Sequence, residues 1–203
     1  MSMARAVYGQ FERPRGLLGE VVGRLMALKN DRRGRWVVDL LQLEAGMRVL
    51  EVGSGPGVDA ARVLERVGDH GSYIGLDASD VMVRQARSRN RPAVRDGRAR
   101  FVVGRLADGV AAELGPFDLA FSINCAQFWP DLGAGLRDIA QGVRSGGRIV
   151  VAVQPMRRGA TEADSARWVE KFSAAADEAG LRVLEIARGA TTPSTVAIVL
   201  EKP

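Results

Sequence analysis

Short runs of apolar and β-branched residues alternate with helical patterns along most of the chain, and the alternation begins at Met47. The runs that predict strands are residues 48–53, 72–77, 100–104, 117–123, 148–154, 182–187 and 195–201. Strands that alternate with helices are typical of a mostly parallel sheet with helices on both faces. We therefore predict an α/β fold built on a doubly wound sheet of seven strands.

The helical patterns between these strands lie at residues 58–67, 80–89, 132–143 and 164–179. The last two strands are separated only by residues 188–194. That length suits a hairpin and is too short for the crossover helix that two parallel strands need. We therefore expect the last strand to run antiparallel.

The first 46 residues have a different character from the remainder. Leu18, Val21, Val22 and Leu25 recur at helical spacing, and a second apolar run follows at 36–41. Residues 47–203 contain no repeat, low-complexity block or linker. We predict an N-terminal helical segment, 1–46, followed by one domain at 47–203.

Composition excludes several classes of protein. The chain has one cysteine, Cys125, and one histidine, His70, so neither an internal disulfide nor a zinc pattern is expected. The longest apolar runs are strand-sized, and the N-terminus lacks the apolar core of a signal peptide. We expect a cytoplasmic protein without a bound metal and without a membrane span.

The net charge of +5 raises the question of nucleic-acid binding. Much of this charge is local, because residues 84–105 contain eight arginines and one acid, Asp96. Binding to nucleic acid requires such charge to be gathered around the site of contact. This segment lies on a flank of the predicted fold, so a solvated or partner-binding surface explains it more simply.

The sequence EVGSGPG at 51–57 leaves a predicted strand and enters a predicted helix. Glycines at 53, 55 and 57 allow a tight turn and a close approach of the backbone to a ligand at the sheet edge. A dinucleotide loop would place its third glycine at position 58, where this chain has Val58. The motif therefore predicts a ligand site and disfavours NAD or FAD. Its alternative reading is a tight turn only.

Asp77 ends the next strand, about 24 positions after Gly53. A carboxylate there is suited to accept hydrogen bonds from both ribose hydroxyls of a bound nucleoside. Its alternative role is to cap the helix at 80–89, a role that Ser79 also fits. Taken together with the glycine loop, the ribose role is favoured.

Four segments, VLEVGSGPG at 49–57, GLDAS at 75–79, FDLA at 117–120 and RSGGR at 144–148, follow one another in the chain. In content and spacing they resemble the class I S-adenosylmethionine-dependent methyltransferases. The resemblance covers residues 47–154 closely and the last strand pair loosely. It implies a Rossmann-like sheet of seven strands with a reversed last strand, and S-adenosylmethionine as cofactor.

The resemblance also implies roles for single residues. Gly53 and Gly55 would contact the methionine part of the cofactor, with Glu51 fixing the loop, while Asp77 would bind the ribose. The complete set expected at the cofactor is Glu51, Gly53, Ser54, Gly55, Gly57, Asp77, Ala78, Met82, Gly104, Arg105, Leu106 and Asn124. Relatives often have an acidic or small polar residue where this chain has Arg105, and arginine cannot accept from the adenine amino group. The backbone of Leu106 or the side chain of Asp108 is left for that contact.

The loop after the fourth strand is expected to meet the substrate. Enzymes that methylate nucleobase amino groups usually carry Asn/Asp-Pro-Pro-aromatic here, whereas Asn124 is followed by Cys-Ala-Gln. This departure disfavours a nucleic-acid substrate. The residues expected at the substrate are Tyr8, Gln127, Phe128 and Trp129. For the two aromatic residues of the loop, packing onto the fold is an equal alternative.

No residue is singled out as catalytic. His70 lies in a predicted turn at the opposite end of the sheet, and Cys125 is expected to be a buried, inert thiol. Methyl transfer is an in-line displacement in which the protein mainly aligns the reactants. The expected activity is methylation of a small-molecule acceptor. The alternatives are an RNA-directed methyltransferase and a relative that binds the cofactor without transfer.

The N-terminal helices correspond to a segment that often covers the cofactor in this family. Residues 8–28 are therefore expected to form a lid, with Gly9, Gly16 and Gly19 permitting its movement. The alternative is a helix pair that only packs on the fold. We expect a monomer or a homodimer.

Overall fold

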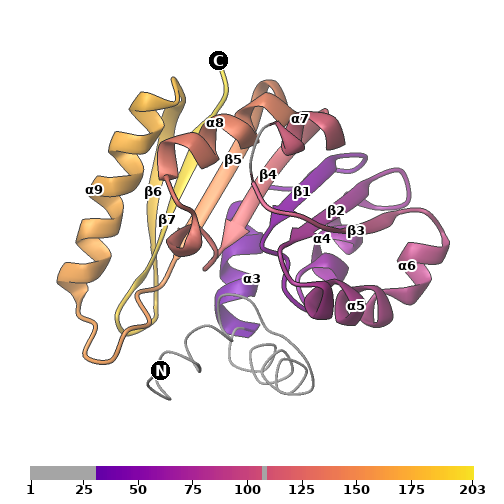
Figure 1. The fold of residues 1–203 in the computed structure, drawn as a ribbon, viewed down its shortest axis with the longest axis horizontal. Helices are drawn as coiled ribbons and strands as arrows, with labels where there is room; N and C mark the ends of the chain where they lie inside the picture. The colour runs from indigo at the N-terminus through magenta and orange to yellow at the C-terminus, as the bar shows by residue number, and fades with distance from the viewer. Residues whose placement is uncertain (1–30, 107–108) are drawn as a thin grey trace.

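The computed structural model describes residues 31–106 and 109–203. These residues form a sheet of seven strands, whose arrangement can be followed in Figure 1. The strand order is β3-β2-β1-β4-β5-β7-β6. In chain order the strands are β1 (Arg48–Val52), β2 (Ser72–Asp77), β3 (Ala99–Val103), β4 (Phe117–Ile123), β5 (Val143–Val153), β6 (Arg182–Gly189) and β7 (Thr195–Glu201). Each of the seven predicted strands is present, which confirms the predicted fold class.

The order of the strands reverses beside β1, as in a doubly wound sheet. β1 pairs in parallel with β2 on one side and with β4 on the other, so the crevice at the carboxyl end of β1 is the point where the order changes. Ligands of open α/β sheets bind at this position. β7 is antiparallel to both β5 and β6, so the hairpin predicted at the end of the chain is confirmed.

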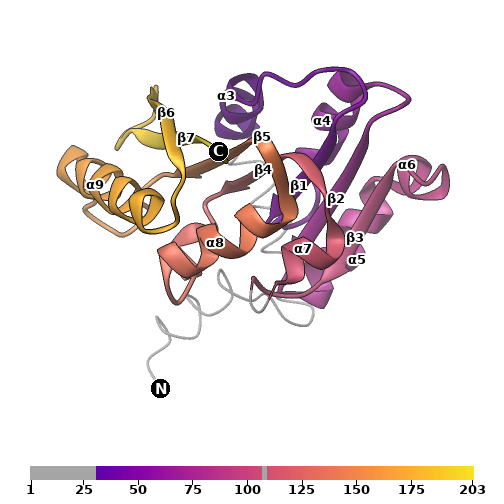
Figure 2. The same ribbon diagram turned by 90° about the horizontal axis from the view of Figure 1, so that it is seen from above.

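Helices cover both faces of the sheet (Figure 2). They are α3 (Asp31–Leu40), α4 (Ala60–Val67), α5 (Asp80–Arg89), α6 (Arg91–Arg95), α7 (Val110–Leu114), α8 (Leu132–Gly142) and α9 (Glu162–Glu178), with a 3-10 turn, η1, at Ala126–Phe128. α3, α4 and α5 contribute to one buried apolar cluster, and α7, α8 and α9 to the other. The inner strand β5 contributes to both clusters, because Ile149 and Val151 belong to one and Val150 and Ala152 to the other. This explains its continuous apolar run.

Two short helices were not expected from the sequence. α6 and α7 have five residues each, which is too short for an apolar period to show, and Pro92 lies in the first turn of α6. The strand β5 also begins at Val143, where the sequence predicted the end of a helix. At the N-terminus, α3 confirms the helix predicted around 36–41. The predicted helix at 18–26 and the lid at 8–28 lie outside the described residues.

Within the described ranges, no helix has the length and apolar character required to cross a membrane.

A buried polar pair joins β1 to β2 inside the sheet. Glu51 is 3% exposed and Tyr73 is 1% exposed, and the Tyr73 hydroxyl donates a hydrogen bond to Glu51 Oε2. Burial raises the pKa of Glu51 well above its usual value, and the negative charge of Asp59 adds to the effect. The protonated form of Glu51 is therefore favoured in the folded protein.

This raised pKa predicts a pH-dependent effect of Glu51→Gln. The Glu51 contribution to stability is complete below the pKa of the unfolded chain and is lost as pH rises toward the folded pKa, because only the unfolded chain gives up its proton easily there. Glutamine does not titrate. We expect the stability of the variant relative to the parent to increase between pH 5 and pH 8, measured by urea unfolding.

The matched control is Glu65→Gln, which changes an exposed residue of α4. Its stability difference from the parent is expected to stay constant over the same pH interval. If the stability difference between Glu51→Gln and the parent is also constant between pH 5 and pH 8, the raised pKa of Glu51 is contradicted. Tyr73→Phe removes the donor instead, and it is expected to cost about 1–3 kcal/mol of unfolding free energy.

Candidate functional site

The glycine loop leaves β1 and reaches α4 over the carboxyl edge of the sheet. Gly53, Gly55 and Gly57 have φ angles of +77°, +52° and +68°, a region that residues with a side chain rarely adopt. The loop is tied to β2, because the backbone N–H groups of Gly53 and Ser54 both donate to the carbonyl of Leu76, at 2.7 and 3.1 Å. The glycines predicted from the sequence therefore form a turn that only glycine accommodates easily.

The far end of this loop is held by α5. Arg89 Nε donates to the carbonyl of Pro56 at 3.0 Å, and Asn90 Nδ2 donates to the carbonyl of Gly57 at 2.9 Å. Arg87 reaches the carbonyl of Phe101 on β3 from the same helix, at 2.7 Å through Nη2. Two arginines of the basic segment thus bind main-chain carbonyls around the site, a role that the sequence did not reveal.

Asp77 connects the loop to the end of β2. Its Oδ2 accepts from the backbone N–H of Gly55 at 2.8 Å, and its Oδ1 accepts from that of Ser79 at 2.8 Å. The helix cap is supplied by Ser79, whose Oγ accepts from the N–H of Met82 at 3.3 Å. Of the two roles considered for Asp77, helix capping therefore belongs to Ser79. Each carboxylate oxygen of Asp77 retains a lone pair for a ligand.

The pKa of Asp77 is raised by burial, and the two backbone hydrogen bonds act against this shift. Hydrogen bonds to a carboxylate favour its ionised form. The residue is therefore a half-buried acceptor group that the main chain orients toward the crevice.

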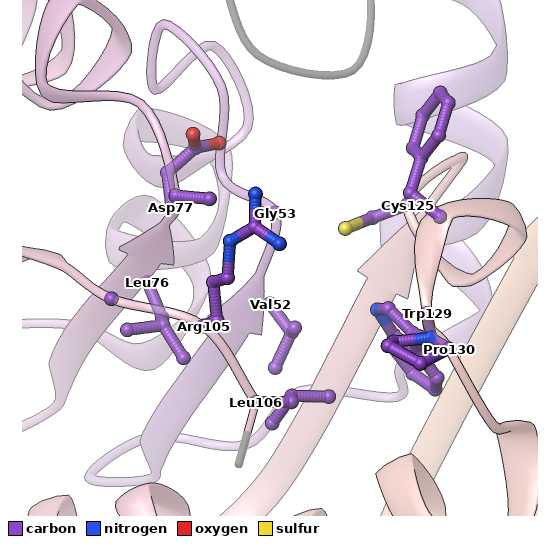
Figure 3. Close-up of a pocket in the computed structure, with 12 residues that line it drawn as sticks. Val52, Gly53, Leu76, Asp77, Arg105, Leu106, Cys125, Trp129 and Pro130 are labelled. Atoms are coloured by element: carbon purple, nitrogen blue, oxygen red, sulfur yellow. The ribbon is translucent and has the colours of Figure 1, made fainter.

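A cavity of about 240 Å³ opens between the ends of β1, β2 and β4 (Figure 3). It is lined by Val52, Gly53, Leu76, Asp77, Ala78, Gly104, Arg105, Leu106, Cys125, Phe128, Trp129 and Pro130. Of the residues predicted for the site, the structure brings together Gly53, Asp77, Ala78, Gly104, Arg105, Leu106, Phe128 and Trp129. The side chains of Asp77 and Arg105 lie on one side of the cavity in Figure 3, and those of Cys125 and Trp129 on the other.

The remaining predicted residues lie near the cavity without lining it. Glu51 pairs with Tyr73 in the core, and Met82 lies in the first turn of α5 and is 2% exposed. Ser54 is buried beneath the loop, where a Cβ at Gly75 would stand 2.8 Å from its Oγ. Gly55 and Gly57 shape the turn.

Of the residues predicted in the loop after β4, Phe128 and Trp129 line the cavity, whereas Asn124 and Gln127 do not. Asn124 has a left-handed φ of +53°, and its Oδ1 accepts from the N–H of Gln154 at 2.7 Å. Gln127 Nε2 donates to the carbonyl of Asn124 at 3.4 Å. Both residues therefore fix the loop and do not line the cavity. Tyr8 and Asp108 lie outside the described residues.

Trp129 packs onto the fold and also lines the cavity, and its contact with the substrate stays a prediction. Its ring packs against α8 so closely that a Cβ at Gly135 would stand 2.6 Å from Cε3, and another part of the residue lines the cavity. The absence of a side chain at Gly135 therefore allows the Trp129 ring to pack closely against α8. His70 is exposed in a turn, as predicted.

Cys125 was not predicted to line the cavity, and it is the residue that closes the wall opposite Asp77. A Cβ built on Gly53 would lie 2.4 Å from both Cβ and Sγ of Cys125, so the glycine allows the loop after β4 to approach the glycine loop. Burial and the negative charge of Asp77 raise the pKa of the Cys125 thiol to about 12. The thiol therefore stays protonated and is not a nucleophile at neutral pH.

This pKa predicts slow alkylation of the only cysteine in the chain. At pH 8 we expect native Cys125 to react with iodoacetamide roughly 1000-fold more slowly than the same residue in the urea-unfolded chain, because the thiolate fraction differs by about that factor. The rate for the native protein should keep rising with pH well above 9. Equal rates for the native and unfolded chains would contradict the raised pKa.

Comparison with known proteins gives a consistent result. Residues 49–147 match the family described as "Methyltransferase domain". An uncharacterized methyltransferase of Bacillus subtilis is 25% identical over 166 residues, which cover 82% of this chain and 88% of that protein.

Two further relatives are more similar over a shorter region. A protein-L-isoaspartate O-methyltransferase of Methanothrix thermoacetophila is 36% identical, and the nocamycin O-methyltransferase of Saccharothrix syringae is 34% identical, each over 117 residues. These regions cover 57% of this chain in both cases, and 51% and 40% of the relatives. The chain therefore matches about half or less of the length of these two proteins.

The backbone has many counterparts among solved structures. One is a chain of the complex between the Haloferax volcanii Trm112 methyltransferase activator and a putative methyltransferase, with a TM-score of 0.71, 19% identity and coverage of 89% of this chain and 93% of that one. Another is the geranyl diphosphate C-methyltransferase of Streptomyces coelicolor, solved with S-adenosyl-L-homocysteine, with a TM-score of 0.66, 13% identity and coverage of 86% and 79%. The similarity to these solved structures concerns the fold. The family match covers residues 49–147, a segment that includes all the described residues that line the cavity. Residues 49–147 therefore form a methyltransferase domain, and the fold of the chain is that of the class I S-adenosylmethionine-dependent methyltransferases.

Proposed function

We propose that this enzyme transfers the methyl group of S-adenosylmethionine to a small organic acceptor. The observation that carries the proposal is the lining of the cavity: apart from Asp77 and Arg105, the described residues that form its wall are uncharged, and most are apolar or aromatic. Enclosed apolar sites with a few oriented polar groups are typical of small ligands. An RNA substrate would require cations gathered around this opening.

The basic segment supports the same conclusion. Arg87 and Arg89 donate to main-chain carbonyls, Arg84 binds Asp80 at 2.5 Å and Arg95 binds Asp96 at 3.2 Å. These side chains stabilise the flank made by α5, α6 and β3. We therefore assign four of the eight arginines of residues 84–105 to contacts within this flank and not to contacts with a nucleic acid.

The residues present fit the cofactor. Asp77 offers a free lone pair on each oxygen for the ribose hydroxyls, while Ala78, Leu76 and Leu106 provide apolar walls for the adenine ring. Among the described residues, and apart from its two chain neighbours, Gly55 has no atom within 4 Å of the point where a Cβ would stand, so these residues leave the loop backbone open to a ligand. We propose that Gly53 and Gly55 contact the amino-acid part of the cofactor.

The bound cofactor supplies an electrophilic methyl group on a positively charged sulfur. The contribution of the chain is to align the acceptor and to exclude water with the apolar wall of Cys125, Phe128 and Trp129. Asp77 is engaged by two backbone N–H groups, and the Cys125 thiol stays protonated. Neither is suited to accept a proton from the acceptor, so we assign catalysis to positioning.

The names of two relatives indicate different acceptors: isoaspartate in proteins for one and nocamycin for the other. The nocamycin enzyme supports a small-molecule acceptor. The isoaspartate enzyme makes a protein acceptor the alternative that an experiment must separate.

The ribose role of Asp77 predicts the effect of Asp77→Asn. Loss of hydrogen bonds to a charged acceptor should weaken S-adenosylhomocysteine binding by about 10- to 100-fold, measured by isothermal titration calorimetry. The control is Asp96→Asn, at the exposed end of α6, which should bind like the parent. If Asp77→Asn remains folded by circular dichroism and binds with unchanged affinity, the ribose role is wrong.

The acceptor class is tested with S-adenosylmethionine carrying a tritiated methyl group, incubated with a cell extract separated into small molecules, RNA and protein. We expect enzyme-dependent label in the small-molecule fraction. Label that is retained by RNA and released by ribonuclease, or label that is retained by protein, would overturn the proposed acceptor. Binding of the cofactor with no transfer to any fraction would indicate a relative that binds without catalysis.

A further inference from the structure

A second cavity, of about 490 Å³, lies beside the first at the carboxyl end of β5. It is lined by Arg33, Gln154, Pro155, Met156, Arg157, Gly159, Ala160, Thr192 and Pro193. These residues come from α3, from the segment that follows β5 and from the turn between β6 and β7. None of them lines the cavity that we assign to the cofactor.

Asn124 connects the two cavities. It precedes Cys125, which lines the first, and its side chain binds two residues of the second: Oδ1 accepts from the N–H of Gln154 at 2.7 Å, and Nδ2 lies 3.0 Å from Met156 Sδ. A ligand in the second cavity is therefore placed next to the loop that we assign to the acceptor.

Arg33 is the notable residue of this cavity. It is only 6% exposed, and one of its guanidinium nitrogens, Nη1, donates to Gln154 Oε1 at 2.7 Å. Its Nε and Nη2 have no hydrogen-bond partner among the residues that the structure describes. Buried donors on a charged group are costly when they are left unpaired. Nε and Nη2 lie along one edge of the planar guanidinium, and two donors in this arrangement match two oxygens of a carboxylate or a phosphate.

The position of Arg33 is fixed by its neighbours. Gln154 Nε2 donates to the carbonyl of Pro193 at 3.2 Å, so the amide of Gln154 is oriented with its oxygen toward Arg33. One residue further along α3, a Cβ at Gly34 would stand 2.5 Å from Asp59 Oδ1, so the glycine allows the helix to lie close to the start of α4. The guanidinium is therefore held in place before any ligand arrives.

Arg33 remains a cation at neutral pH. Burial lowers its pKa to about 10, and the negative charge of Asp59 acts against this shift. Asp59 itself is bound by Arg62 at 2.5 Å. The other arginine of the lining, Arg157, is bound by Asp164 at 2.8 Å. Among the described residues that line this cavity, Arg33 is therefore the cation with guanidinium nitrogens, Nε and Nη2, that have no hydrogen-bond partner.

We propose that the second cavity holds an anionic group, a carboxylate or a phosphate, of the methyl acceptor, and that Arg33 Nε and Nη2 donate to two of its oxygens. The inference rests on the proposed function and specifies its substrate class. The acceptor would be a small anion whose charged end lies at Arg33, in the second cavity, and whose reacting atom lies on the other side of Asn124, in the first cavity. The cofactor has a carboxylate of its own, and the experiment distinguishes the two sources.

The experiment measures the rise in melting temperature of the full chain on addition of sodium acetate or sodium phosphate, at ionic strength held constant with sodium chloride. Saturating S-adenosylhomocysteine is present, so that the binding site of the cofactor carboxylate is filled. We expect at least one of the two anions to stabilise the parent with saturation, and the more effective anion identifies the group. In Arg33→Gln, the concentration for half of the effect should increase at least about 10-fold.

Arg32→Gln is the matched control, because it removes a charge from an exposed neighbour on the same helix. Its anion response should equal that of the parent. Arg33→Lys keeps the charge and loses the paired donors, and it should retain only a part of the response. If Arg33→Gln fails to fold, the comparison of Arg33→Lys with Arg32→Gln decides the question.

Affinity for S-adenosylhomocysteine, measured on the same variants, separates the two proposals. We expect the affinity of Arg33→Gln to stay within about twofold of the parent. A tenfold loss would assign Arg33 to the carboxylate of the cofactor and overturn the inference, as would an anion response that is equal in parent and variant. If the parent itself does not bind S-adenosylhomocysteine, the proposed function fails. The anion response can then be measured without S-adenosylhomocysteine, and a response that Arg33→Gln weakens would still locate an anion site at Arg33.

Discussion

The carboxylate of Asp77 is the contact on which the site depends. It accepts from the backbone of Gly55 with one oxygen and from that of Ser79 with the other, so it joins the glycine loop after β1 to the first turn of α5. Both elements are also joined at their other ends, because Arg89, the last residue of α5, and Asn90, its C-cap, bind the carbonyls of Pro56 and Gly57. The loop is therefore closed into a frame by hydrogen bonds at both ends. A ligand that binds Asp77 meets a group already oriented by the main chain.

Much of this arrangement could be predicted from the sequence. The alternation of strand and helix patterns gave the sheet and its reversed last strand, because each strand is a distinct apolar run and the last connection is short. Gly53 and Asp77 were found from their spacing, since both lie at strand ends where the fold places ligands. Elements of five residues, α6 and α7, carry too few apolar positions to be recognised.

The rest of the site depends on contacts between distant segments. Nothing in the sequence around Arg33 indicates that it meets Gln154, which is 121 residues away. The same is true of Cys125 and Gly53, which approach each other only because β4 and β1 are neighbours in the sheet. The arginines of residues 84–105 were read as a solvated flank, and the structure shows that Arg87 and Arg89 bind carbonyls of β3 and of the loop. Sequence composition records the charge of such residues but not their partners.

The contact between Gly53 and Cys125 has a consequence for how this protein can change over evolutionary time. The absence of a side chain at one position makes room for the thiol at the other, so the two positions form one steric unit. Substitution to a bulkier residue at 125 would push the loop after β4 away from Gly53 and change the wall of the cavity. Position 125 can therefore change at the expense of the cavity wall, whereas a side chain at position 53 would meet both a left-handed backbone and the thiol.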